Sequence, residues 1–245
     1  MISVIVPVLN EVAIVGAALE RLLQQRGDYE IIVVDGGSSD GTCEVVQRLA
    51  LPVRLVHKPP AMPPGIGSQI NLGAQQARGR VLIFLHVDVQ LPPGGLVRVE
   101  AALAEPHIVG GGFLPTFHGP VPNSERIVLA LVERAWRART CTFRWFAGDT
   151  APFIRADVFR RGGEYPSTCF ASDWDFAAHL RRLGRLAVIR EPVRVNCRRH
   201  VYNGVLKTLF VTGSLEVMYR IGADRAFMRD WYRRWLPRER EVNRR

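Results

Sequence analysis

Short runs of β-branched and aliphatic residues alternate with amphipathic stretches over the first third of the chain. Compact apolar runs predict buried strands, and apolar residues at every third or fourth position predict helices. Strands are expected at 2–6, 30–35, 53–57 and 80–85, and helices at 11–25, 40–49 and 66–77. Alternation with connections this short favours an α/β fold, in which helices flank both faces of a mostly parallel sheet.

After residue 88 the alternation becomes less regular. The pattern predicts helices at 96–104, 124–139 and 173–183, strands at 109–117, 185–190 and 193–197, and helices again at 205–219 and 224–235. No stretch of about 18 uninterrupted apolar residues occurs, so no membrane-spanning helix is expected. The start of the chain lacks the charged region of a secretory signal, and the four cysteines are widely spaced, which favours reduced thiols in a cytoplasmic protein.

Polar residues follow several of the expected strands, and parallel sheets bind ligands at the carboxyl ends of their strands. Asn10 and Glu11 come after the first strand, where they could grip a base or a ribose, or begin a helix. Asp35 comes after the second strand, at the start of Asp-Gly-Gly-Ser-Ser-Asp-Gly. Its carboxylate could accept a hydrogen bond from a ribose or a base, and the glycines allow close approach to the backbone. A tight turn that precedes a capped helix is the alternative.

His86 and Asp88 follow the fourth expected strand and indicate a divalent cation. Residues i and i+2 of a strand face the same side, so both side chains could meet one ligand. Mg²⁺ and Mn²⁺ prefer oxygen ligands and need few from the protein when phosphates supply others. A polar strand end without a metal is the alternative.

Asp173 and Asp175 stand near the start of an expected helix. Either carboxylate could act as a general base that takes a proton from a hydroxyl group. Capping of the helix is the alternative.

The net charge of the 245-residue chain is +10, and all of the excess lies in the second half. Residues 1–122 carry a net charge of −2, and residues 123–245 carry +12. A basic surface of this kind attracts phosphate groups, whether in nucleic acid, in anionic lipid or in a phosphorylated substrate.

Six short motifs stand in an order that resembles the family 2 glycosyltransferases with the GT-A fold. They are PVLNE near residue 7, DGGSSDGT near 35, QINLGAQQARG near 69, FLHVDV near 84, GGE followed by SDWDF at 163–176, and then LRRLGR. The resemblance spans about residues 1–200, and the last third also resembles a short bacterial subgroup often found near radical-SAM and selenium-domain genes. His86 departs from the family pattern, because it stands where the DxD motif has its first Asp. The loop 64–68 lacks the arginine expected before Gln69.

The resemblance implies an inverting glycosyltransferase of the hexosyltransferase type, which moves a sugar from a UDP- or GDP-linked donor to a hydroxyl group with the help of Mg²⁺ or Mn²⁺. It implies a GT-A domain over 1–200, with a nucleotide-sugar part at 1–122, an acceptor part at 123–200, and a helical extension at 201–245 packed on it. Asp173 would be the general base, and Asp88 with His86 would hold the metal. The residues implied in donor binding are Pro7, Asn10, Glu11, Asp35, Gly37, Ser38, Gln69, Asn71, Arg198 and Arg199.

Two other functions compete with this interpretation. A sugar-phosphate nucleotidyltransferase shares such a nucleotide-binding half but usually opens with a basic glycine-rich loop, which PVLNE does not resemble. A nucleic-acid-binding protein would explain the charge, but the sequence holds no recognition motif, so no nucleic acid is expected as a partner.

The apolar segment 205–219, with the Trp- and Arg-rich tail after it, has two interpretations. It could contact the inner face of a membrane peripherally, which would suit a lipid-linked acceptor. It could instead pack over the catalytic domain or against a second subunit in a homodimer.

Overall fold

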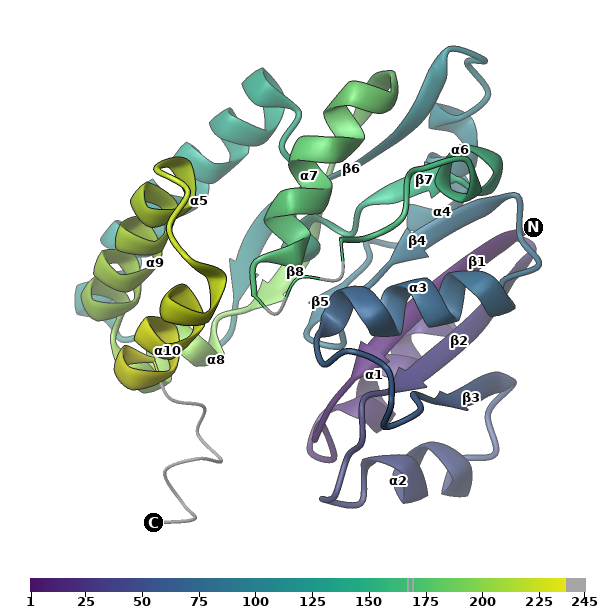
Figure 1. Cartoon of the computed structure of the whole chain (residues 1–245), viewed down its shortest axis with the longest axis horizontal. Coiled ribbons are helices and arrows are strands. Elements are labelled where there is room, and N and C mark those ends of the chain that lie inside the picture. Colours follow the sequence, from purple (N-terminus) through teal and green to yellow (C-terminus); the bar gives the residue numbers. More distant parts are fainter. Residues whose placement is uncertain (167, 169, 237–245) are drawn as a thin grey trace.

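The protein is described by a computed structural model that covers residues 1–166, 168 and 170–236, the side chain of Arg199 excepted. An eight-stranded sheet crosses the molecule in the order β3-β2-β1-β4-β7-β6-β8-β5 (Figure 1). Its strands are β1 (Ile2–Val8), β2 (Tyr29–Asp35), β3 (Val53–His57), β4 (Val81–Phe84), β5 (Val89–Gln90), β6 (Ile108–His118), β7 (Phe153–Arg155) and β8 (Arg185–Asn196).

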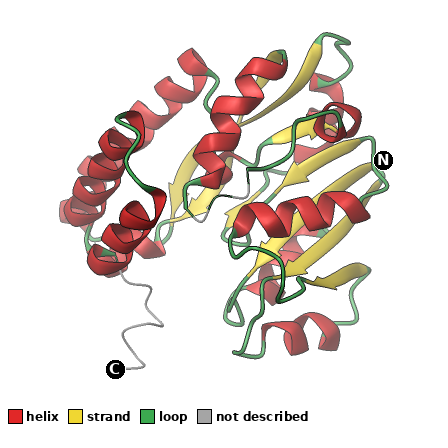
Figure 2. Ribbon diagram, in the orientation of Figure 1, coloured by secondary structure: helices red, strands yellow, loops and turns green. Residues whose placement is uncertain are grey.

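Helices cover both faces of this sheet (Figure 2). They are α1 (Val15–Leu22), α2 (Thr42–Arg48), α3 (Ile66–Gln76), α4 (Gly95–Ala102), α5 (Asn123–Phe143), the short 3₁₀ helix η1 (Gly148–Thr150), α6 (Ala156–Arg160), α7 (Ser172–Leu183), α8 (Arg198–Asn203), α9 (Val205–Arg220) and α10 (Arg225–Trp235). Apolar side chains of α1, α2 and α4 pack on one face, and those of α3, α6 and α7 pack on the other. The central strands are buried on both faces, which is why they read as continuous apolar runs.

The first four strands form the parallel sheet that the sequence predicts. β1 pairs in parallel with β2 and β4, and β2 with β3, so their carboxyl ends meet at one edge. The second half of the sheet adds two antiparallel strands. β7 runs antiparallel between β4 and β6, and β5 runs antiparallel to β8. Strands of three and two residues are too short to leave a periodic pattern in the sequence.

Three local expectations were wrong in detail. The first helix begins at Val15 rather than at residue 11, because Asn10 has a positive φ of 55° and its side chain bonds to the next loop instead of capping a helix. The strands expected at 185–190 and 193–197 are one strand, β8, with a register shift. His86 and Asp88 lie between β4 and β5, where the chain turns, and not on a strand.

Helix α3 locks the ends of two strands together through a buried amide. The Nε2 atom of Gln69 donates hydrogen bonds to the carbonyl oxygens of Val8 (2.9 Å) and Val34 (2.8 Å). Gly73 allows the helix to approach this closely, since a Cβ atom there would lie 2.5 Å from Ile5. The pairing of Gln69 fixes the edge at which the loops after β1 and β2 begin.

The C-terminal helices form a smaller apolar cluster of their own. Val211, Leu215, Met228 and Leu236 are buried between α9 and α10, with Trp174 of α7 packed against them. No helix in the described part of the chain is long and apolar enough to cross a membrane. Among the described cysteines, Cys43, Cys141 and Cys197 are free thiols, and only Cys197 is buried. The fourth cysteine, Cys169, lies outside the described residues.

Replacing Gln69 by leucine removes both buried hydrogen bonds at similar side-chain volume. We expect the free energy of unfolding to fall by about 1–3 kcal/mol, because buried carbonyl groups lose a donor. Chemical denaturation measures the change. Gln75→Leu on the exposed side of the same helix is the matched control and should stay within about 0.5 kcal/mol of the wild type. Equal stability of the two variants would contradict the structural role of Gln69.

Candidate active site

The loops after β1 and β2 are interlocked by hydrogen bonds at the carboxyl edge of the sheet. The backbone N–H of Asn10 donates to Ser38 Oγ (2.8 Å), and the backbone N–H of Ser39 donates to Asn10 Oδ1 (2.8 Å). The backbone N–H of Glu11 donates to the hydroxyl of Thr42 (2.8 Å). The structure therefore brings the first two predicted motifs together as one surface, although 28 residues separate Asn10 from Ser38.

Asp35 ends β2 in a buried position beneath this surface. Its carboxylate accepts hydrogen bonds from the backbone N–H groups of Gly37 (3.0 Å) and Ser38 (3.1 Å). Burial alone would raise the pKa of Asp35, but the hydrogen bonds from Ser38, Gly37 and Cys43 outweigh it and hold this pKa below its ordinary value. The group therefore stays an ionised acceptor.

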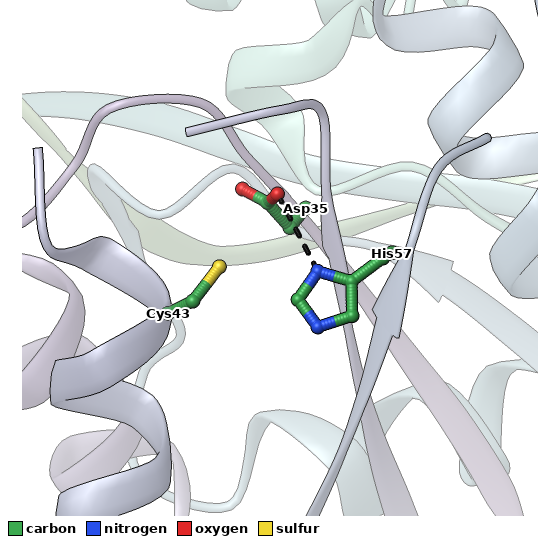
Figure 3. A group of neighbouring side chains, drawn as sticks. All are labelled: Asp35, Cys43 and His57. Carbon is green, nitrogen blue, oxygen red and sulfur yellow. Dashed lines mark ion pairs between the residues drawn. The ribbon is translucent and has the colours of Figure 1, made fainter. Parts of the chain in front are cut away.

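Cys43 and His57 flank the Asp35 carboxylate (Figure 3). Position 57 pairs with position 35 in the β2–β3 register, and His57 Nδ1 lies 3.7 Å from Asp35 Oδ2. Burial and the negative charge of Asp35 raise the pKa of the Cys43 thiol to about 11, so it remains protonated. The sequence places His57 at the end of the third expected strand, but only the strand register, which is a tertiary property, brings it to Asp35.

Three other residues implied in donor binding have structural partners in the protein. Pro7 is buried within β1, opposite Val34 of β2. The side-chain amide of Gln69 donates its hydrogen bonds to carbonyl oxygens of β1 and β2. Asn71 pairs with the backbone of Tyr165 in both directions, at 2.8 Å and 2.9 Å. This pair joins α3 to the segment that leads into α7.

A second constellation forms where β4 ends. Ligand atoms of His86, Asp88 and Asp149 all lie within 4.8 Å of one another. His86 and Asp88 come from the turn after β4, and Asp149 comes from η1, immediately before β7. Because β7 runs antiparallel to β4, the start of one strand lies beside the end of the other, which brings Asp149 to the predicted pair. Asp149 is a candidate ligand that the sequence motifs did not reveal. The sign of it in the sequence is that Asp149 is the one charged residue of the run Phe146–Ile154.

The imidazole of His86 is held in a tight cradle. A Cβ atom on Gly148 would lie 2.2 Å from the ring, so only glycine leaves room for it. Nδ1 faces Asp149 Oδ1 at 3.8 Å, and Nε2 is buried with no hydrogen-bond partner among the described residues. One imidazole nitrogen and two carboxylates, partly buried and close together, form a set that could hold a divalent cation.

Arg198 links the two constellations. Its guanidinium lies 3.0 Å from Glu11 Oε2 and 3.9 Å from Asp88 Oδ2. Pairing of β5 with β8 accounts for this position, since the backbone N–H of Asn196 donates to the carbonyl of Asp88 just before α8 begins. Arg199 belongs to α8, and its side chain lies outside the described part of the structure.

Asp173 and Asp175 differ sharply in their surroundings. Asp175 accepts hydrogen bonds from Thr168 (3.1 Å), Tyr219 (2.9 Å) and Arg225 (2.6 Å), so both of its oxygens are occupied. Burial and the bond to Asp175 raise the pKa of Tyr219 to about 12. Asp173 is half-buried in the first turn of α7, and within the described residues no hydrogen bond or ion pair holds it.

A family model described as Glycosyl transferase family 2 matches residues 3–159. This protein belongs to the family 2 glycosyltransferases. A PGL/p-HBAD biosynthesis glycosyltransferase from Mycobacterium bovis is 36% identical over 110 residues, which is 43% of this chain and 42% of that protein. An undecaprenyl-phosphate 4-deoxy-4-formamido-L-arabinose transferase from Aeromonas hydrophila is 35% identical over 117 residues, which is 45% of this chain and 36% of that protein. The matched regions thus span less than half of either relative.

Solved structures show that the fold is GT-A, as the motif order implied. A mannosyltransferase from Pyrobaculum calidifontis, in complex with GDP-Man and Mn²⁺, superposes with a TM-score of 0.64 at 20% identity, over 91% of this chain and 64% of that one. Glucosyl-3-phosphoglycerate synthase from Mycobacterium tuberculosis, in complex with Mn²⁺, UDP and glucosyl-3-phosphoglycerate, superposes with a TM-score of 0.58 at 19% identity, over 91% of this chain and 81% of that one.

Replacing Asp149 by asparagine tests whether this carboxylate belongs to a cation site. We expect the affinity for Mn²⁺ in the presence of UDP or GDP to fall roughly tenfold or more, because a charged oxygen ligand becomes a neutral one. The electron paramagnetic resonance signal of free Mn²⁺, recorded during a titration, measures this affinity. Asp157→Asn, which changes an exposed carboxylate, is the control and should bind Mn²⁺ normally. Unchanged affinity in Asp149→Asn, with loss in Asp88→Asn, would remove Asp149 from the site.

Proposed function

We propose that this protein is an inverting hexosyltransferase, which moves a sugar from a UDP- or GDP-linked donor to an acceptor hydroxyl in a single displacement. The observation that carries the proposal is the meeting of His86, Asp88 and Asp149 beside the interlocked loops that hold Asp35. A cation set next to a nucleotide-sized polar surface suits a donor that consists of a nucleoside, a diphosphate and a sugar. Membership of the family supports the same reaction class.

The donor set fits a resident Mg²⁺ or Mn²⁺. Asp88 and Asp149 would supply oxygen ligands, and His86 would supply a nitrogen, which favours Mn²⁺ over Mg²⁺ because Mg²⁺ demands oxygen more strictly. The buried Nε2 of His86, which has no partner among the described residues, supports such a ligand role. When bound, the cation neutralises negative charge on the diphosphate and helps it to leave.

The protein's own residues orient and stabilise the donor. Asp35 offers a permanently charged acceptor to an N–H or O–H group of the nucleoside, and Asn10, Glu11, Gly37 and Ser38 frame the same surface. The guanidinium of Arg198 could turn from Glu11 and Asp88 to the diphosphate of the donor. There it would stabilise the negative charge that develops as the diphosphate leaves the sugar. Gln69 holds the ends of β1 and β2, where the loops of this surface begin.

Asp173 is the residue proposed as the general base. In the displacement, the acceptor oxygen attacks the anomeric carbon opposite the leaving diphosphate, the bond from that carbon to the diphosphate oxygen breaks, and the hydroxyl proton passes to Asp173. The surroundings of Asp175 support this choice, because its oxygens already accept three hydrogen bonds. Its oxygens are therefore not free to meet the hydroxyl of an acceptor.

The proposal also includes a domain division, an acceptor class and a location for the protein. We divide the chain into a GT-A domain at 1–200, with a donor part at 1–122 and an acceptor part at 123–200, and a helical extension at 201–245. The Aeromonas hydrophila relative is named for transfer to undecaprenyl phosphate, which supports a lipid-linked acceptor and a place near the inner face of a membrane. No contact in the described part of the chain favours a nucleotidyltransferase or a nucleic-acid-binding protein over this function.

Comparison of the variants Asp173→Asn and Asp175→Asn tests which carboxylate acts as the general base. We expect Asp173→Asn to lower kcat by about 10²- to 10⁴-fold, because the proton loses its acceptor, with nucleotide affinity and thermal stability unchanged. Asp175→Asn should instead lower the melting temperature, since it weakens three hydrogen bonds, and Tyr219→Phe should do the same to a smaller degree.

Product formation in a screen of hydroxyl-bearing acceptors measures transfer, and calorimetry with UDP and GDP measures nucleotide affinity. Near-normal turnover in Asp173→Asn would rule out this residue as the base.

A further inference from the structure

Helix α9 is apolar on the side that faces solvent as well as on the side that faces the protein. Its inner residues Val205, Val211 and Leu215 are buried. Its outer stripe, which we call the α9 face, consists of Leu206, Phe210, Gly213, Val217 and, just past the helix, Ile221. The side chains of the four large residues are 69%, 66%, 59% and 75% exposed. A helix that is apolar on two opposite sides is normally covered on both.

Neighbouring helices extend this exposure. Helix α5 lies beside α9 (Figure 1), joined to it by the ion pair of Arg139 with Glu216 at 3.0 Å. Ile127 and Leu131 of α5 are 74% and 63% exposed. Most of the exposed large apolar side chains in the described residues lie on the segment from α8 to α10 and on α5. Exposed apolar side chains thus concentrate on helices that contact α9, which favours an interaction site in this part of the fold over an even scatter.

The exposed charged residues of helix α9 itself are positive. Lys207 and Arg220 are exposed on α9. The only carboxylate of the helix, Glu216, is paired with Arg139 and Arg220. The half of the chain to which this surface belongs carries a net charge of +12. The partner that fits apolar side chains flanked by cations is a layer with an apolar interior and an anionic surface.

We propose that the α9 face docks on an anionic lipid bilayer as a peripheral membrane contact. A second copy of the chain fits less well, because a two-fold interface would set Lys207 and Arg220 against the same positive face of the partner. Insertion across the bilayer is not involved, since no described helix is long and apolar enough for it. The contact is a shallow one, through side chains of one helix face.

The fold connects this surface rigidly to the proposed base. Asp175 on α7 binds both Tyr219 of α9 and Arg225 of α10, so the helix that carries Asp173 is fixed to the docking helices. Arg198 is the first residue of α8, and Gly204 alone lies between the end of α8 and the start of α9. Docking would therefore hold Asp173 and the candidate active site at a set height and orientation above the membrane. This step rests on the proposed function, and it explains how a transferase could reach an acceptor whose lipid remains in the bilayer.

Flotation of the whole protein with lipid vesicles tests the proposal. We expect binding to vesicles that contain phosphatidylglycerol and little binding to pure phosphatidylcholine. The triple variant Leu206→Ser, Phe210→Ser, Ile221→Ser should bind anionic vesicles at least about tenfold more weakly, because these side chains no longer enter the interface. Because all three are exposed, the variant should fold normally, and calorimetry with UDP or GDP checks its donor site.

Two further variants separate the apolar and the charged contributions. Lys207→Gln with Arg220→Gln should weaken binding to anionic vesicles roughly tenfold and reduce its dependence on salt. Val97→Ser, which removes a 47% exposed valine from α4, is the matched control and should float like the wild type.

The proposal is overturned if the wild type does not float with anionic vesicles, or if the triple variant floats as well as the wild type. It is also overturned if size-exclusion chromatography with light scattering shows a dimer that the triple variant converts to a monomer without any vesicle binding, since the second copy would then be the occupant. If the wild type floats with anionic vesicles but binds neither UDP nor GDP, the proposed function is contradicted and the membrane contact is not.

Discussion

Hydrogen bonding between β4 and the antiparallel strand β7 determines which side chains meet at the carboxyl edge of the sheet. Parallel pairing of β1, β2 and β4 gathers the loops after these strands at one edge, but all of them come from the first 90 residues. The antiparallel strand returns the chain to that edge from the other direction and places Asp149 beside His86. The pairing of β5 with β8 does the same for Arg198 and Asp88. Two short strands thus complete a site that the parallel sheet only begins.

The polar groups around this site divide into those that support the structure and those that are available for ligands. Gln69, Asn71 and Asp175 direct their hydrogen-bonding atoms to partners within the protein. A buried polar group without a partner is costly, so these contacts stabilise the arrangement of strands and helices. The ring of His86 and the carboxylate of Asp173 lack such saturation among the described residues. That contrast distinguishes Asp173 from its neighbour two positions away, which composition and spacing could not do.

The two halves of the chain differ in charge and contribute different residues to the candidate site. The nearly neutral first half supplies Glu11, Asp35 and Asp88 to the proposed donor site, where a cation would balance the phosphates. The basic second half contributes Arg198 to the same site, and Lys207 and Arg220 on helix α9. Within this second half, Asp175 of α7 holds α9 and α10 together, because its carboxylate accepts hydrogen bonds from Tyr219 and Arg225.

The first four strands and the family could be predicted from the residue pattern and the motif order, because strand periodicity and loop motifs are local properties of the chain. The same pattern placed Asp35, His86 and Asp88 after strands. Three features appear only in the folded protein: His57 faces Asp35, Asp149 lies beside His86 and Asp88, and Asp175 anchors the C-terminal helices. Each of these depends on a strand register or a helix contact between distant segments, and the side chains carry no local sign of it. The sequence thus set which groups were present, and packing decided which of them remain free for chemistry.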